Sequence, residues 1–125
     1  MLLNLWANMG IVKIFRGDSN NLVLDIKNGD NLNYSDYSLE QGDTIYFGLM
    51  EVHQKFEDAI LKKVYTLQDV NEDGDIIIDI NPLDTEYLLP GKYYYSIKMK
   101  KNKTSKDDDY DVYTLVKETE FWILN

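Results

Sequence analysis

The sequence predicts an all-β protein, an antiparallel β-sandwich of about seven strands, and three observations lead to this fold class. Apolar residues recur with a period of two along most of the chain, as in strands that bury one face. Glycine-containing turns separate these runs at short intervals, which is typical of antiparallel sandwiches. The third observation is an aromatic-rich segment after a Pro-Gly turn, at residues 88–95. No linker or internal repeat divides the 125 residues, so we predict one domain over residues 10–125 after an N-terminal extension or docking strand at residues 1–9.

The seven predicted strands span residues 11–16, 21–27, 43–52, 60–67, 75–80, 92–100 and 110–124. Alternation within them predicts five buried stripes: Leu22, Leu24 and Ile26; Ile45, Phe47 and Leu49; Ile76, Ile78 and Ile80; Tyr93, Tyr95, Ile97 and Met99; and Val112, Thr114 and Val116 followed by Thr119, Phe121 and Ile123. The step from Val116 to Thr119 breaks the period, which predicts a β-bulge near Lys117 or Glu118. Residues 52–59 and 81–88 each have room for one helical turn, and residues 101–109 form a polar hairpin loop.

The most informative segment runs from Leu88 through a Pro-Gly turn into three consecutive tyrosines. It resembles the E–F corner of immunoglobulin-like sandwiches, where a buried tyrosine closes the corner by bonding to the backbone upstream. We expect one of the three tyrosines to take this part. Alternation favours Tyr93 and Tyr95 as the buried pair, with Tyr94 pointing outward. The predicted sandwich is therefore immunoglobulin-like.

Charge and composition exclude several classes of function. Thirteen Lys and Arg against 22 Asp and Glu give a net charge of −9, which argues against binding to nucleic acid or to an anionic membrane. Without cysteine there is no disulfide framework, cysteine nucleophile or thiolate zinc site. The one histidine, His53, lacks any nucleophile motif, so we predict a solvated histidine and a protein that is not an enzyme. No apolar run approaches the ~20 residues of a membrane span, and the first residues do not form a signal peptide.

One segment is a weak candidate for a calcium site. Asp69, Asn71, Asp73 and Asp75 place oxygen ligands at alternate positions beside a glycine, as in the opening of a calcium loop. The twelfth position should be a bidentate glutamate but is Ile80, part of a predicted strand stripe. An acidic hairpin turn is therefore the preferred interpretation, and no cofactor is expected. The tripeptide Arg16-Gly17-Asp18 is likewise interpreted as the turn between the first two strands.

Aromatic residues expected at the surface leave two interpretations open. Trp6, Tyr34, Tyr37, Tyr94 and Trp122 could stack on sugar rings or anchor a protein interface. Packing and ordinary strand propensity also account for aromatic residues in a sandwich of this size.

Residues 12–19 and 22–26 resemble the opening strands of the immunoglobulin-like module in baseplate and tail-tip proteins of phages and prophages of Gram-positive hosts, of the type found at the N-terminus of upper baseplate proteins. Residues 42–47, 73–78, 84–95, 112–115 and 121–123 keep the same order of elements, so the resemblance covers Gly10 to Leu124. It implies a viral structural protein, made in the bacterial cytoplasm and located in the virion or in a phage-tail-like particle. Its implied partners are other tail or baseplate proteins and further copies of itself.

The leading hypothesis is therefore a non-catalytic structural component that acts through assembly contacts. The expected assembly surface comprises Leu2, Leu3, Leu5, Trp6 and Trp122, and the N-terminal strand is expected to pair with a neighbour's sheet edge. On this hypothesis, deletion of residues 1–8 blocks incorporation without unfolding the domain. The alternative is a carbohydrate-binding or calcium-stabilised adhesion module for host-surface recognition. Position within the particle stays open.

Overall fold

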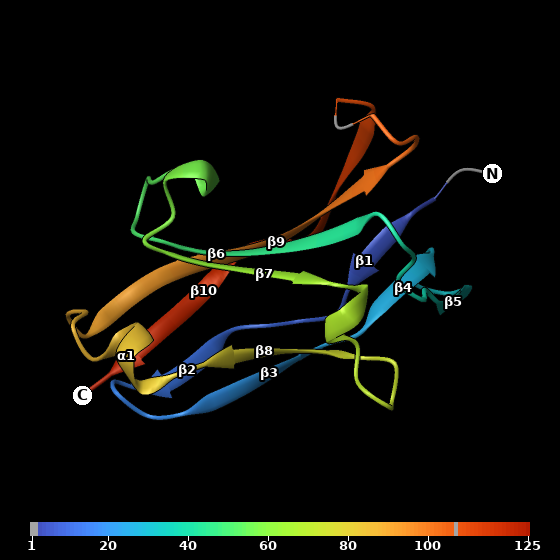
Figure 1. The fold of residues 1–125 in the computed structure, drawn as a ribbon. Coiled ribbons are helices and arrows are strands. Elements are labelled where there is room, and N and C mark those ends of the chain that lie inside the picture. Colours follow the sequence, from blue (N-terminus) through green and yellow to red (C-terminus); the bar gives the residue numbers. More distant parts are fainter. Residues whose placement is uncertain (1–2, 107) are drawn as a thin grey trace.

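The computed structural model describes residues 3–106 and 108–125 and shows an all-β protein (Figure 1). Its strands are β1 (Leu5–Ala7), β2 (Val12–Phe15), β3 (Asn20–Leu24), β4 (Ile26–Gly29), β5 (Tyr34–Asp36), β6 (Asp43–Met50), β7 (Leu61–Thr66), β8 (Ile76–Ile80), β9 (Gly91–Asn102) and β10 (Tyr110–Leu124). Two 3₁₀ turns, η1 (Phe56–Asp58) and η2 (Leu67–Asp69), and one short helix, α1 (Pro82–Thr85), connect them. The predicted helical turns in residues 52–59 and 81–88 are confirmed as η1 and α1.

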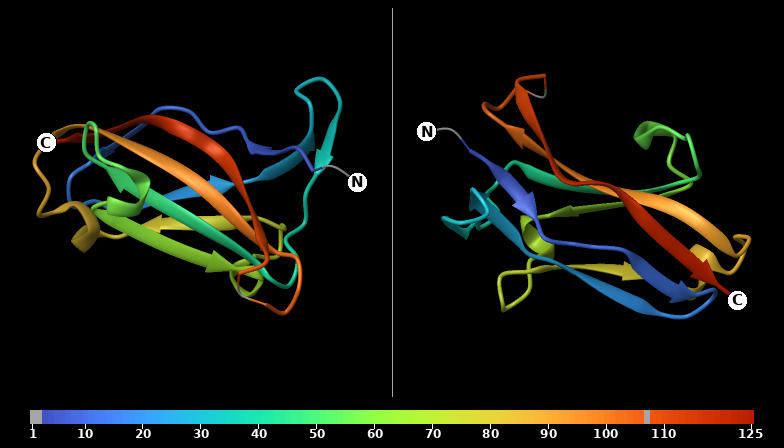
Figure 2. Two further views of the ribbon diagram at one scale, coloured as in Figure 1. Left: turned by 90° about the horizontal axis from the view of Figure 1, so that it is seen from above. Right: turned by 180° about the vertical axis from the view of Figure 1, so that it is seen from behind.

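The largest unit is a curled five-stranded sheet in the order β2-β10-β9-β6-β7. Its pairs are antiparallel except β2 with β10, which run parallel with Ile14 opposite Ile123. The prediction of an entirely antiparallel fold is therefore wrong at this pair. The N-terminal segment passes from one sheet to the other after β1, so β2 reaches the sheet edge running in the same direction as the last strand (Figure 2).

Shorter strands face the curled sheet. β3 pairs with β8, and β4 pairs with β1 and β5, all antiparallel. The single strand predicted over residues 21–27 is thus divided at Asp25, and its two halves belong to different sheets. At the break, Lys27 Nζ forms ion pairs with the carboxylates of Asp25, at 2.9 Å, and Asp36.

The core lies between these layers and follows the predicted alternation closely. Four predicted stripes are confirmed, with Leu22 only half-buried at the end of the first. The last stripe is wrong in its first half, because β10 shifts register twice, between Thr114 and Val116 and again before Thr119. The second shift confirms the predicted bulge, whereas the first turns Val112 outward, 57% exposed, and buries Leu115.

Residues 5–7 belong to the folded sheet. β1 pairs with β4, and the side chains of Leu5 and Ala7 are buried in the core. Leu5, which was expected on a docking surface, is only 5% exposed and cannot contact a partner there. Removal of residues 1–8 would therefore take away core side chains as well as surface ones. Leu2 lies outside the described residues.

The predicted corner is closed by Tyr93. Its partly buried hydroxyl donates a hydrogen bond to the carbonyl oxygen of Leu89, four residues upstream, at 2.6 Å. Two residues further along β9, Tyr95 is fully buried, and Tyr94 between them points to the opposite face of the sheet. Burial raises the pKa of Tyr93 because the ionised phenolate would lose its hydration. No helix among the described residues is long and apolar enough to cross a membrane.

Candidate docking surface

The side of the five-stranded sheet that faces away from the core, called here the outer face, carries an unusual set of side chains. β9 places Lys92, Tyr94, Lys98 and Lys100 on this side, because they alternate with buried residues. The neighbouring strands add further large side chains to it, in register: Tyr46, Val64, Tyr110, Val112 and Trp122. Aromatic rings and lysines thus occupy one surface of an acidic protein.

Trp122 lies near one end of the outer face, where it is directly opposite Lys92. The ammonium of Lys92 sits over the rings of both Tyr94 and Trp122, 5.8 Å from each centroid. Each such cation–π contact contributes on the order of 0.5–1 kcal/mol at an exposed site. The indole N–H of Trp122 donates to the Glu120 carboxylate at 2.9 Å. Lys92 thus contacts both rings, and the bond to Glu120 orients the indole.

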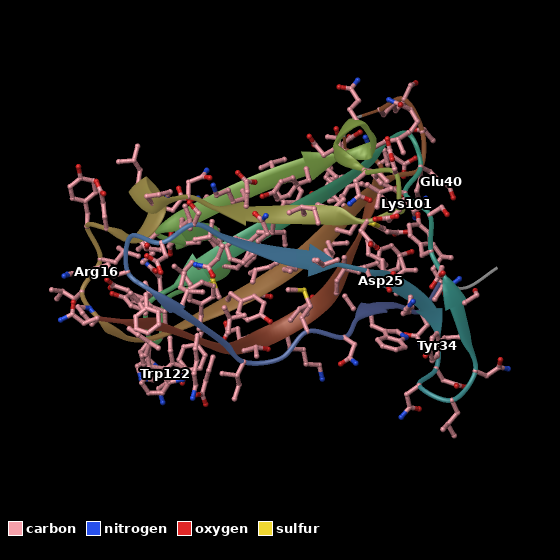
Figure 3. The ribbon with its side chains drawn as sticks, turned by 90° about the horizontal axis from the view of Figure 1, so that it is seen from below. Arg16, Asp25, Tyr34, Glu40, Lys101 and Trp122 are labelled. Carbon is pink, nitrogen blue, oxygen red and sulfur yellow. The ribbon has the colours of Figure 1, made fainter. Side chains whose placement is uncertain are left out.

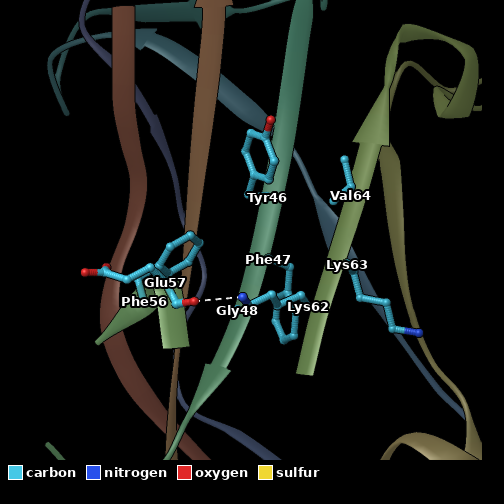
Figure 4. Close-up of a pocket in the computed structure, with 8 residues that line it drawn as sticks. All are labelled: Tyr46, Phe47, Gly48, Phe56, Glu57, Lys62, Lys63 and Val64. Carbon is cyan, nitrogen blue, oxygen red and sulfur yellow. Dashed lines mark hydrogen bonds between the residues drawn. The ribbon is translucent and has the colours of Figure 1, made fainter. Parts of the chain in front are cut away.

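A hollow in the same face lies between β6, β7 and η1 (Figure 4). η1 folds Phe56 back onto Gly48, and a Cβ at position 48 would be 2.9 Å from Cε1 of that ring. The resulting pocket has a volume of about 360 Å³, and its walls include Tyr46, Phe56 and Val64. Lys62 Nζ donates to the Glu57 carbonyl oxygen at 2.7 Å, which ties β7 to η1. This hollow is large enough for one bulky apolar side chain.

Seven of the twelve lysines show one of two patterns of contact. Away from the outer face, four of them form ion pairs with carboxylates: Lys27, Lys63, Lys101 and Lys103. On the outer face, Lys92, Lys98 and Lys100 lie over aromatic rings, with Lys98 Nζ 4.8 Å from the Phe56 centroid and Lys100 Nζ 4.3 Å from that of Tyr110. Within the described chain no carboxylate oxygen lies within 4.0 Å of these three ammonium groups. Their charge is therefore available to an acidic partner.

The predicted interface residues do not form one surface. Trp6 packs edge-on against Tyr34, with centroids 5.3 Å apart, and its indole N–H donates to the Gly29 carbonyl oxygen at 2.9 Å. Tyr34 and Trp122 lie at opposite ends of the molecule (Figure 3). Leu3 is half-buried and packs against the core. Among the predicted residues that the structure describes, Trp122 is the one on the outer face.

Tyr37 has an internal role instead of a surface one. Its hydroxyl donates to the carboxylate of Asp43 at 2.6 Å and accepts from Lys101 Nζ at 2.9 Å. Asp43 is buried, and Lys101 also contacts it directly at 3.2 Å. Burial, followed by the bond to Asp43, raises the pKa of Tyr37 to about 12. The network fastens the segment before β6 onto the sheet.

Two of the four candidate calcium ligands, Asn71 and Asp69, accept hydrogen bonds from nearby backbone N–H groups. Asn71 Oδ1 accepts from the N–H groups of Asp73 and Asp75, both at 3.0 Å. Asp69 accepts from the Thr66 N–H at 2.8 Å, in the capping box of η2. Across residues 3–106 and 108–125, no group of three or more His, Asp or Glu side chains is placed to hold a metal ion. His53 is exposed in the turn after β6, at a φ of 67°.

Sequence reasoning missed the central feature of the outer face. The alternation of Lys98 and Lys100 with buried residues was visible, but their aromatic partners come from η1 and β10. No local pattern marks Phe56 as the residue that covers Gly48. No family model matches the chain, and no curated protein or solved structure gave a significant match.

Proposed function

We propose that the chain is an immunoglobulin-like β-sandwich that serves as a non-catalytic structural component of a phage tail or baseplate, or of a phage-tail-like particle, by binding other proteins. Two features support the fold. The shorter strands pack against the five-stranded sheet around one buried core, as the two layers of a sandwich do. The Tyr93 hydroxyl closes the corner before β9 through the Leu89 carbonyl.

The observation that carries the proposed mode of action is the outer face. Half-buried and exposed aromatic rings gather on this face, and aromatic side chains contribute much of the binding energy at protein interfaces. The lysines beside them lack carboxylate partners and favour an acidic partner. The Trp122 indole is oriented by its hydrogen bond to Glu120, which reduces the side-chain entropy lost on binding. The pocket beside Phe56 offers a place for one anchoring side chain of the partner.

The particle assignment rests on the resemblance of residues 10–124 to baseplate and tail-tip modules. A rigid sheet face with fixed side chains suits the repeated, symmetric contacts of such an assembly. Proteins of the same particle are the partners that this assignment implies, and the virion is the implied location.

The alternative, a carbohydrate-binding module, receives less support from the same residues. Sugar rings stack on open aromatic faces, whereas Lys92 Nζ lies over both Tyr94 and Trp122. A calcium-stabilised adhesion module would need free oxygen ligands in the loop before β8, and Asn71 Oδ1 is engaged by two backbone N–H groups.

The proposal is tested by quantitative mass spectrometry of density-banded particles from an induced producing culture. We expect the chain in the particle band at a fixed ratio to the major tail protein, near a multiple of about three or six as cyclic symmetry requires. Absence from the band would refute the structural role. Saturable binding of the purified chain to cell-wall glycans, lost on Tyr94→Ala, would then favour the alternative.

A further inference from the structure

The hollow between β6, β7 and η1 is a single cavity with largely apolar walls. Tyr46 of β6 and Val64 of β7 lie directly opposite each other in the sheet and form two of these walls. Phe56 of η1 forms a third wall above the backbone of Gly48. All four residues line the same cavity of about 360 Å³, so an apolar side chain placed there contacts several of them at once. Cavities of this size and composition are typical binding sites.

Two lysines reach the η1 side of this hollow from opposite sides of β6. Lys62 belongs to β7, and its Nζ donates to the Glu57 carbonyl oxygen of η1 at 2.7 Å (Figure 4). Lys98 belongs to β9, and its Nζ lies 4.8 Å from the centroid of the Phe56 ring. Because β6 lies between β7 and β9 in the sheet, the two side chains approach η1 from its two sides. The hollow therefore has a positively charged group on each side of its aromatic wall.

These two ammonium groups form no ion pair within the described chain. No carboxylate oxygen among residues 3–106 and 108–125 lies within 4.0 Å of Nζ of Lys62 or Lys98. Lys63 also lines the hollow, but its ammonium is paired with a carboxylate of α1 at 2.7 Å. η1 carries two carboxylates of its own, Glu57 and Asp58, and the Glu57 side chain points away from β6 and β7 (Figure 4). A carboxylate of a partner can therefore bind Lys62 and Lys98 without breaking an ion pair.

We propose that the hollow binds a segment of a partner protein in which carboxylates flank one bulky apolar side chain. The apolar side chain fills the cavity between Phe56 and Val64 and is removed from water there. The flanking carboxylates form charge-assisted hydrogen bonds with the ammonium groups of Lys62 and Lys98. This inference rests on the proposed function and specifies the chemistry of the partner that docks on the outer face.

Charge decides between this partner and other segments that could fill an apolar cavity. A segment rich in lysine or arginine would be repelled by the two ammonium groups, and a wholly apolar segment would remove them from water without supplying an opposite charge. The chain as a whole has a net charge of −9, but its repulsion of an acidic segment is screened beyond about 8 Å at physiological salt. The charges beside the hollow therefore control binding, and the affinity should fall as salt is added.

The test is calorimetric titration of the full chain with a peptide of about nine residues whose ends are blocked. A central tryptophan lies between two glutamates, and the other positions are serine or threonine. We expect a dissociation constant on the order of 10⁻⁵ M. Replacement of the tryptophan by alanine, or of both glutamates by glutamine, should each weaken binding at least about tenfold. The first loss reports filling of the cavity, and the second reports pairing with the lysines.

Variants of the chain locate the bound peptide. Lys62→Glu and Lys98→Glu should each weaken binding of the acidic peptide at least about tenfold, and their combination should prefer a peptide with lysines in place of the glutamates. Lys92→Glu is the matched control on the same face, because its ammonium lies over Tyr94 and Trp122 instead of at the hollow. It should leave the dissociation constant within about twofold of the wild-type value. Circular dichroism and thermal melting confirm that each variant is folded.

An acidic peptide that does not bind at about 1 mM, or that binds equally well with glutamine in place of glutamate, would overturn the proposal. An equal loss in Lys92→Glu would place the peptide elsewhere on the outer face and overturn its assignment to the hollow. Self-association of the chain that the peptide reverses would show that a second copy fills the hollow and would overturn the assignment to another protein. Absence of the chain from particles would refute the proposed function and leave the peptide result unchanged.

Discussion

The two faces of the five-stranded sheet are built from the same strands, yet one face is buried in the core and the other faces outward. On the inner face, β6 and β9 present Phe47 and Tyr95, which are essentially inaccessible to solvent. One residue away, the same strands present Tyr46 and Tyr94 to the outside. Both faces are rich in tyrosine and phenylalanine, so hydrophobicity alone does not separate them.

Their polar partners do separate them. Inner-face hydroxyls bond to fixed groups of the fold, as Tyr95 does to the Gly10 carbonyl oxygen at 2.6 Å and Tyr65 to Asp79 at 2.9 Å. Outer-face rings are accompanied by lysines over their π faces. The inner set therefore stabilises the fold, and the outer set is available for a partner.

The largest difference in stability between the two faces is expected when Tyr95→Ala is compared with Tyr94→Ala. Tyr95 packs between Phe47 and Phe121, with both centroids 5.9 Å away, so its removal leaves a large cavity. We expect a loss of about 3–5 kcal/mol in the free energy of unfolding for Tyr95→Ala, against less than about 1 kcal/mol for Tyr94→Ala. Urea unfolding measures both. Equal losses would contradict the division of the sheet into a structural and a binding face.

A second difference concerns tyrosine hydroxyls and pH. The hydroxyl of Tyr65 on β7 bonds to Asp79 on β8 and holds the pKa of that carboxyl below its usual value. Asp79 therefore adds stability above its unfolded pKa, and this stability is lost as the pH falls through the lower, folded pKa. Tyr65→Phe should lower stability by about 1.5 kcal/mol near neutral pH and flatten the acid side of the stability profile.

The control is Tyr46→Phe, which alters a hydroxyl on the outer face. Thermal melting between about pH 2 and pH 7 follows both variants through the carboxyl range. Tyr46→Phe should reproduce the wild-type profile. An unchanged acid slope in Tyr65→Phe would show that the bond to Asp79 does not join the two sheets energetically.

Tyr93→Phe changes an inner-face residue two positions before Tyr95, and it should lower stability less than Tyr95→Ala does. The ring stays in place and the bond to the Leu89 carbonyl is lost, which leaves that acceptor without its partner. We expect a loss of about 1 kcal/mol by chemical denaturation. Tyr94→Phe, one residue along and facing outward, should change stability by less than about 0.5 kcal/mol. A larger effect from Tyr94→Phe would reverse the assignment of the corner.

The smallest stability effect is expected at Gly48. An alanine Cβ there would approach Phe56 Cε1 to 2.9 Å and displace the ring, which is the free end of a side chain. We expect a cost below about 1 kcal/mol, together with loss of the ring-current shift of the Lys98 side chain in NMR spectra. Gly10→Ala is the control, because no atom lies within 4 Å of its added Cβ. An unshifted Lys98 resonance in Gly48→Ala would show that the pocket can accommodate the methyl group.

Much of the inner face could be predicted because burial imposes a period of two on the sequence. The stripe of Ile45, Phe47 and Leu49 and the corner at Tyr93 depend on local spacing, and both are present. The break at Asp25 is different, because it depends on pairing with β1 and β8, which local spacing around Asp25 does not encode. The parallel pairing of β2 with β10 joins residues more than a hundred positions apart, which no local pattern encodes.

The outer face was predicted only in outline. Trp122 and Tyr94 could be placed outside by alternation, and the structure puts them side by side under Lys92. Trp6 was expected on the same assembly surface as Trp122, but it packs against Tyr34 at the far end of the molecule. Exposure can be inferred from period, whereas proximity on a surface depends on tertiary folding.

The most direct test of the outer face as the assembly surface is competitive incorporation into particles. The wild type is co-expressed with a variant that carries Lys98→Glu and Trp122→Ala, and mass spectrometry of the purified particles gives the ratio of the two chains. The control carries Val23→Asp, an exposed substitution on β3 of the opposite layer. We predict that the outer-face variant is depleted at least about tenfold, as a loss of ~1.4 kcal/mol in docking requires, while the control enters at the wild-type level. Equal incorporation of the folded outer-face variant would contradict the assignment of function to this face.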